Sequence, residues 1–268
     1  MFKKSLITVA VATLALTQVA KAQTNLQVFY DFAPDRQHVT TTLEGFYNDN
    51  WGNTFFFIDH DFGSKDSNNR PYAPSGTYME IARCLNFWQN TVMAPFSLQV
   101  EYNGGVYNGY TINNAWLGGV DFFLHSSDFK NTFNFKLLGK YINYAGGLDL
   151  SGNKRKSLVP LQFTFVWGMQ DLFGVKGLRF SGFADFWFEN HTVFNWSDTA
   201  APGLGLRDPL SAKDSQFVFL SEPQIWYNVG QWFGVDNLNI GGEVELAFDF
   251  GTLAGFRARP CAGLKWVF

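Results

Sequence analysis

The sequence contains no long hydrophobic run beyond its first 22 residues. Nowhere in residues 23–268 do 18 apolar residues follow one another, and a helix needs about 20 such residues to cross a bilayer. The sequence therefore predicts no membrane-spanning helix, although 18% of the residues are aromatic and Phe alone numbers 30. The mean hydropathy is nevertheless slightly negative, at −0.09. This combination is typical of strands that are apolar on one face and polar on the other.

Cysteine and basic charge are also scarce. Only Cys84 and Cys261 are present, far apart in the sequence. A disulfide between them is conceivable in an exported protein, but we expect two unpaired cysteines on non-adjacent strands. The formal net charge of −3 gives no support to nucleic-acid binding. No glycine-rich phosphate loop, zinc-type spacing or calcium loop occurs, so we expect neither a cofactor nor a metal.

The first 22 residues have the pattern of an export signal. Lys3 and Lys4 give a basic start, residues 6–16 are apolar, and Ala20-Lys21-Ala22 forms a small-x-small cleavage site. The apolar stretch is too short for a spanning helix, and the absence of a cysteine after the site argues against lipoprotein processing. We predict a signal peptide over residues 1–22 and one mature domain over residues 23–268.

Side chains alternate between apolar and polar along most of the mature chain. In the last segment, residues 256–268, one face is apolar while the other carries Arg257, Arg259 and Lys265. This period of two is typical of membrane strands with one face toward lipid and the other toward a polar lumen. The chain ends on Phe268. A terminal Phe on such a strand resembles the signal read by the barrel-assembly machinery, which we expect as a partner.

Twelve alternating segments, each about ten residues or longer, cover the mature chain. Segments of this length cross a bilayer when tilted, and because backbone polar groups in lipid must pair internally, the strands must close into a barrel. The sequence predicts an all-β fold, a transmembrane antiparallel up-and-down β-barrel of about 12 strands with both termini on the periplasmic side; ten or fourteen strands stay open. The predicted strands are 26–34, 38–47, 53–62, 76–87, 95–104, 111–124, 130–144, 157–168, 177–190, 214–228, 237–250 and 256–268.

The links between these segments alternate between short turns and longer polar loops, as in outer-membrane barrels. Two short turns share a pattern, Leu172-Phe173-Gly174-Val175 and Trp232-Phe233-Gly234-Val235. We interpret them as a repeated hairpin with aromatic residues at the membrane interface. The longest loop, 191–214, could fold inward as a constriction or outward as a contact surface, and the sequence does not decide between the two.

The segment 43–81 resembles a known family. Leu43-Glu44 and Phe46 precede Trp51, Asp59 follows, and Tyr78-Met79-Glu80-Ile81 comes last. This pattern is similar to that of the nucleoside-specific channel-forming proteins of outer membranes, the Tsx-like porins. Beyond residues 43–81 the resemblance is one of overall length and the terminal Phe. It implies a narrow, monomeric, twelve-stranded barrel that passes nucleosides.

Strand parity assigns a lumen wall without reference to any family. It groups acidic and aromatic residues on three neighbouring predicted strands and adds basic residues from the last strand. Aromatic rings can stack on a flat solute, and carboxylates accept strong hydrogen bonds from hydroxyl or amino groups. The candidate substrate-binding residues are Glu44, Phe46, Phe55, Phe57, Asp59, Asp61, Tyr78, Glu80, Arg257 and Arg259.

A structural role for the same charges stays open. Because an unpaired buried charge is costly, Glu44, Asp59 and Glu80 could simply form ion pairs across the lumen. Their expected partners are Arg257, Arg259 or Lys136. Such pairs would fill and stiffen the barrel without any solute.

Three classes of function follow, of which a channel is the one we expect. An enzyme acting on lipids needs a Ser beside a His, and His125-Ser126-Ser127, the one tight cluster, lies in a predicted turn. Asp59-His60-Asp61 predicts no metal site, because adjacent strand residues point to opposite faces. The third class is a sealed structural barrel. We therefore expect a non-enzymatic channel in the outer membrane of a Gram-negative bacterium, with membrane lipid and a small nucleoside-like solute as partners.

Overall fold

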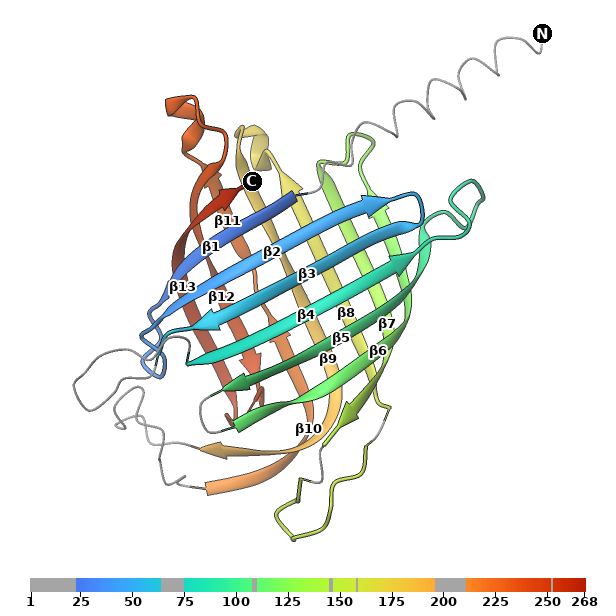
Figure 1. Ribbon diagram of the computed structural model, residues 1–268, viewed down its shortest axis with the longest axis vertical. Coiled ribbons are helices and arrows are strands. Elements are labelled where there is room, and N and C mark those ends of the chain that lie inside the picture. Colours follow the sequence, from blue (N-terminus) through green and yellow to red (C-terminus); the bar gives the residue numbers. More distant parts are fainter. Residues whose placement is uncertain are drawn as a thin grey trace.

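The computed structural model describes residues 23–63, 75–107, 110–144, 147–157, 159–195, 211–251 and 253–268. In these residues the chain forms an antiparallel sheet that closes on itself as a barrel (Figure 1). The predicted signal peptide, residues 1–22, lies outside the described residues.

No helix in the described part of the chain is long and apolar enough to cross a membrane. The strand segments of the barrel are β1 (Gln23–Asp31), β2 (Val39–Asp49), β3 (Gly52–Asp61), β4 (Gly76–Leu85), β5 (Phe96–Tyr107), β6 (Tyr110–His125), β7 (Asn131–Asn143), β8 (Leu161–Gln170), β9 (Leu178–Asn195), β10 (Ser211–Ser221), β11 (Gln224–Asn228), β12 (Leu238–Phe248) and β13 (Phe256–Val267).

Segments β10 and β11 occupy one position in the wall, so the barrel has twelve strands. Both pair with β9 on one side and with β12 on the other. The prediction of an uninterrupted strand over 214–228 is wrong at Glu222 and Pro223, which separate the two segments. Proline has no backbone N–H, so it cannot donate to a sheet ladder. The Pro223 carbonyl still accepts from Val244 at 3.1 Å, which keeps the wall continuous.

The barrel closes between its first and last strands. Strand β13 pairs with β12 on one side and β1 on the other, with Asn25 opposite Val267. The Phe268 N–H donates to the Thr24 carbonyl at 2.9 Å. The remaining strands pair with their neighbours in the chain. The predicted fold class is thereby confirmed. Strand β1 begins and strand β13 ends at the same end of the barrel, which we call the terminal end (Figure 1). The opposite end is the loop end.

Alternation along each strand separates an inward face from an outward face. On β1, Asn25, Gln27 and Phe29 are buried, whereas Leu26 and Val28 between them are 40% and 42% exposed. The register carries this division around the wall, because residues paired across antiparallel strands share a face. Exposed large apolar side chains such as Leu26, Val28 and Leu43 lie on the outward face, the arrangement of strands that border lipid in membrane barrels.

The turns at the terminal end are compact and carry aromatic residues. The two repeated turns both form a single turn of 3-10 helix, η1 (Leu172–Gly174) and η2 (Gly230–Phe233). Gly174 and Gly234 both adopt the left-handed conformation, with φ of 76° and 71°, which glycine adopts without steric cost. The glycines thus repeat as predicted, but the turns differ at the preceding residue, because Phe173 is left-handed, with φ of 55°, and Phe233 is not. The link between β4 and β5, also at this end, covers residues 86–95 and is slightly longer than the predicted link over 88–94.

Apolar side chains pack inside one half of the barrel. They extend inward from β6 and β7 and meet residues of β9, β10 and β12, and Leu138, Ile142 and Val218 are fully enclosed. We call this set the interior apolar cluster; it comprises Ala115, Leu117, Leu138, Ile142, Tyr144, Trp187, Val218, Leu220 and Ala247. The lumen is thus asymmetric, with a filled half opposite strands β2 to β4.

Candidate functional site

Strands β2, β3 and β4 bring the predicted acidic and aromatic residues together on one inward wall. Across the three strands the register aligns Thr42 with Asp59 and Asp59 with Tyr78. The next inward row joins Glu44, Phe57 and Glu80 in the same way. Phe46 and Phe55 form the row nearest the terminal end, and Asp61 pairs with Thr40 at the loop end. We call this surface the β2–β4 wall.

Three aromatic rings form a ladder along the wall. The Phe55 and Phe57 ring centroids are 6.1 Å apart, and the Phe57 and Tyr78 centroids are 5.9 Å apart. Both pairs are tilted by about 50°, with interplanar angles of 53° and 52°. The inward residues of β3 and β4 from Phe55 to Glu80 keep intermediate exposure despite facing the interior. The wall therefore borders accessible space, in contrast to the interior apolar cluster.

The carboxylates of the wall are held by neutral donors. Asn25 Nδ2 donates to Glu44 Oε1 at 2.8 Å, and Thr42 Oγ1 donates to Asp59 Oδ1 at 2.6 Å. Tyr78 Oη donates to Glu80 Oε1, also at 2.6 Å. Among the described residues none of these three carboxylates forms an ion pair with a lysine or arginine. Their expected pairing with Arg257, Arg259 or Lys136 is therefore wrong.

The predicted arginines face the lumen, but Arg259 has other partners. It is 2% exposed and forms an ion pair with Glu245 on β12 and another, at 2.8 Å, with Asp35 in the link between β1 and β2. Arg36 in the same link contacts Glu245 at 2.6 Å and Asp31 at 3.3 Å. This rim cluster fastens the link to strands on the far side of the β1–β13 seam. Arg257 pairs across the ladder with Ala247 and is partly exposed.

Lys140 and Lys265 also lack carboxylate partners at contact distance in the described residues. Lys140 Nζ lies 3.8 Å from the Trp187 ring centroid and 3.0 Å from Gln162 Oε1. Lys265 Nζ lies 4.2 Å from the Trp226 ring centroid. Both side chains are more than nine-tenths buried. Their ammonium groups are thus stabilised by indole faces, and no carboxylate in the described residues lies within ion-pair distance of either one.

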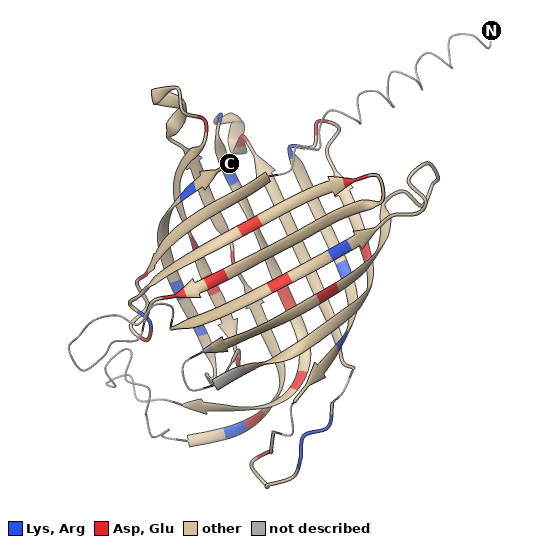
Figure 2. Ribbon diagram, viewed as in Figure 1, with Lys and Arg blue, Asp and Glu red and all other residues tan. Residues whose placement is uncertain are grey.

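Further acidic residues face the same lumen from other strands. They were visible in the sequence as the polar members of alternating segments, but parity alone did not relate them to the β2–β4 wall. Figure 2 shows acidic positions on neighbouring strands β2 to β5 and on strands behind them. These additional inward carboxylates are Glu101 on β5, Asp121 on β6, Asp185 on β9, Glu222 between β10 and β11, and Glu243 on β12.

His125 and His60, the histidines of the two predicted clusters, contact no serine hydroxyl in the described residues. His125 ends β6, and its Nδ1 contacts the Ser126 carbonyl at 2.8 Å rather than a hydroxyl. His60 Nδ1 lies 2.9 Å from Thr77 Oγ1 on the outward face, while Asp59 and Asp61 face inward. No group of three or more acidic, His or Cys side chains in the described ranges has the spacing of a metal site. Cys84 and Cys261 are both free.

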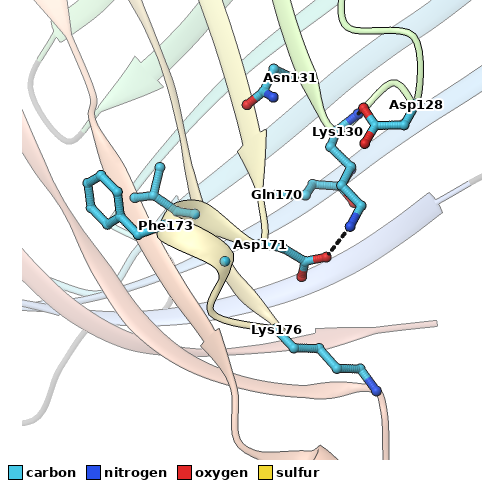
Figure 3. Close-up of a pocket in the computed structure, with 9 residues that line it drawn as sticks. Asp128, Lys130, Asn131, Gln170, Asp171, Phe173 and Lys176 are labelled. Carbon is cyan, nitrogen blue, oxygen red and sulfur yellow. Dashed lines mark hydrogen bonds and ion pairs between the residues drawn. The ribbon is translucent and has the colours of Figure 1, made fainter.

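A depression at the terminal end lies outside the lumen. It is lined by the turn before β7 and by η1, and the Lys130 ammonium lies 2.7 Å from Asp171 Oδ2 (Figure 3). The hydrogen bond from Lys130, followed by that from the Gly177 N–H, lowers the pKa of Asp171 below its ordinary value. Phe173 in the same turn is 91% exposed. None of the predicted lumen residues reaches this depression.

Comparison with known proteins matches this architecture to one family. The model of "Domain of unknown function (DUF5020)" matches residues 23–268, which is the whole barrel. The chain belongs to this DUF5020 family. No curated protein matches its sequence.

Solved structures show where the fold of this DUF5020 member recurs. The barrel resembles the NanC porin with a TM-score of 0.53 and 7% sequence identity, over 91% of this chain and 98% of that one. The KdgM porin, solved in complex with disordered oligogalacturonate, gives a TM-score of 0.44 and 10% identity over 92% of this chain and 99% of that one. The likeness to the NanC porin shows a shared barrel fold.

Proposed function

We propose that this DUF5020 barrel is an outer-membrane channel that passes small polar solutes along the β2–β4 wall. The observation that carries the proposal is the asymmetry of the lumen. Inward side chains of β3, together with Tyr78 and Glu80 of β4, keep access to the interior, whereas the interior apolar cluster fills the opposite half. A twelve-stranded barrel has a slim interior, so a solute confined to one side would pass in contact with the aromatic ladder and its carboxylates.

The finer form of the proposal concerns a flat solute with hydroxyl or amino groups, a nucleoside being the first candidate. The rings of Phe55, Phe57 and Tyr78 offer successive apolar faces about 6 Å apart. Each step could exchange one stacking contact for the next, and such contacts tolerate different bases. Beside the rings, Asp59 and Glu80 have free lone pairs that accept hydrogen bonds from sugar hydroxyls. Conduction further needs each contact to be weak enough to release the solute.

Liposome swelling tests both levels of the proposal. Vesicles containing the refolded protein should swell in nucleosides faster than in sugars of equal size. Phe57→Ala should reduce this advantage, because it removes the central ring of the ladder, whereas Phe56→Ala, on the outward face of the same strand, should not. Equal rates for nucleosides and sugars would remove the finer proposal but keep the channel. No swelling in any solute would remove the channel.

Delivery to the membrane is part of the same proposal. Residues 1–22 would direct export and be cleaved, and β13 with Phe268 would be read by the barrel-assembly machinery. A closed barrel leaves no unpaired edge strand, which supports a monomer in contact with membrane lipid. Deletion of Phe268 should lower the amount of folded protein in outer-membrane fractions without changing the amount synthesised.

A sealed structural barrel is the second candidate, favoured by how densely part of the interior is packed. Besides the interior apolar cluster, Trp226 is 1% exposed and lies 5.5 Å, centroid to centroid, from Phe29 on β1. Side chains of β1 and β11 thus meet inside the barrel. Absence of ion conductance in planar bilayers, with the protein folded, would favour this candidate over the channel.

A further inference from the structure

Acidic side chains on strands from different sides of the barrel act on one another across the lumen. Glu80 on β4 and Glu101 on β5 are diagonal neighbours on adjacent strands, and both interact electrostatically with Asp185 on β9. We call these three residues the waist carboxylates. Carboxylates that act on one another repel when both are ionised, and either a bound proton or a positive charge between them relieves this repulsion.

The waist carboxylates have only neutral hydrogen-bond donors in the described structure. Tyr78 Oη donates to Glu80 at 2.6 Å, and Gln99 Nε2 donates to Glu101 Oε2 at 2.5 Å. Asp185 has the Thr164 hydroxyl on one side. Its other oxygen, Oδ1, is enclosed and has no partner among the described residues, and the Asp185 residue is 8% exposed. A buried carboxylate oxygen left unpaired is costly, which points to a donor that enters from the lumen.

Two lysines face this region but do not fill that role. The positive charge of Lys140 interacts electrostatically with Glu80 and Asp185. Its Nζ nevertheless lies against the Trp187 ring and Gln162. The positive charge of Lys136 interacts electrostatically with Asp185 and Asp121, but Lys136 forms no ion pair with either in the described residues. The lysines reduce the negative potential without supplying a donor to the free oxygen.

We propose, as a deeper form of the channel proposal, that the waist carboxylates bind the ammonium group of an organic amine. An ammonium carries three donors and no acceptor, which suits acceptors converging from two sides of the lumen. Asn103 Oδ1, on the residue paired with Glu80, is a further enclosed acceptor without a partner in the described part. The aromatic ladder begins at Tyr78, next to Glu80, so the apolar part of an amine would lie along it. An inorganic divalent ion is the competing source of positive charge, although the described residues contain no metal-type cluster.

Titration of 1,4-diaminobutane into the detergent-solubilised barrel tests the site itself. The wild type should bind the diamine, and the variant Glu80→Gln/Asp185→Asn should bind it about tenfold or more weakly, because buried charge-assisted bonds are lost. Asp236→Asn is the matched control, since it removes an exposed carboxylate in a terminal-end turn and should bind like the wild type. If the double variant does not fold, Glu101→Gln replaces it. Equal binding by wild type and variant overturns the proposal, as does calcium that binds at lower concentration than the diamine and displaces it.

Planar-bilayer recording separates this proposal from the channel proposal. The wild-type channel should prefer potassium over chloride in a salt gradient, and the diamine should block its current. In Glu80→Gln/Asp185→Asn the potassium preference should fall by about threefold or more and the block should disappear. A conducting channel that the diamine does not block overturns the amine site alone. No conductance overturns the channel, and the titration then still decides whether the site binds amines.

Discussion

Replacing Arg259 by Met should both destabilise the barrel and loosen its rim. The Arg259 side chain is 3% exposed and contacts Glu245, whose side chain is 9% exposed, and Asp35 at 2.8 Å. The substitution leaves two carboxylates with Arg36 as their one remaining guanidinium in the rim cluster. Removing one partner of a buried ion pair typically costs about 3–5 kcal/mol. Because Arg36 still holds Glu245, we expect the lower end, about 3 kcal/mol.

Urea unfolding of the barrel from lipid vesicles, followed by the fluorescence of its nine Trp residues, measures this loss. Lys130→Met is the control, since it breaks an ion pair of similar length, 2.7 Å, between side chains that are 49% and 31% exposed; it should leave the midpoint nearly unchanged. The Arg259 variant should also show larger conductance, because Asp35 no longer ties the β1–β2 link to β13. A variant as stable as the wild type would refute the argument that the rim cluster fastens this link.

Three further substitutions test packing, close approach and charge. Leu138→Ala should lower the free energy of unfolding by about 2–5 kcal/mol, because Leu138 is fully enclosed in the interior apolar cluster. The adjacent Leu137→Ala, on the outward face, should lower it clearly less. Equal losses in urea unfolding would contradict the assigned faces. Gly182→Ala should destabilise the barrel by about 1–3 kcal/mol, since a Cβ there would lie 2.4 Å from the Glu222 carbonyl oxygen. Gly118→Ala is the control, because a Cβ there meets nothing closer than 3.9 Å. Similar unfolding midpoints for the two variants would count against the close packing of Gly182 on Glu222. The lowered pKa of Asp171 means that its pairing contributes above the ordinary carboxyl pKa and is lost as pH falls through the lowered value. An NMR titration should show this, and Lys130→Met should move the midpoint upward; an unchanged midpoint would exclude Lys130 as the cause.

Alternation in the sequence was sufficient to predict the faces of the wall. Phe57 and Asp59 share the inward face, and His60 points away, because a strand has a period of two whatever its surroundings. The strand number followed from the same pattern. The interruption at Pro223 was also predictable from the sequence, since proline lacks the backbone N–H that donates in a sheet ladder.

Contacts across the lumen could not be predicted in this way. Parity assigns Glu80 and Asp185 to the interior, but whether they meet depends on the tilt and stagger of a closed barrel. The partners of Arg259 were mispredicted for the same reason, because Asp35 reaches it from a link rather than from a strand. Leu138 also shares the inward parity of Lys136 and Lys140, and an enclosed apolar cluster contradicts the simple expectation of a polar lumen.

The central claim is that alternate residues of β3 border a water-filled lumen inside a closed barrel. Single cysteines at positions 56 to 59, in a background with Cys84→Ser and Cys261→Ser, can be labelled in lipid vesicles with a water-soluble, membrane-impermeant thiol reagent. Phe57→Cys and Asp59→Cys should react, whereas Phe56→Cys and Ile58→Cys should stay unlabelled until detergent is added. Equal labelling of all four positions, or labelling of only the outward pair, would contradict the account.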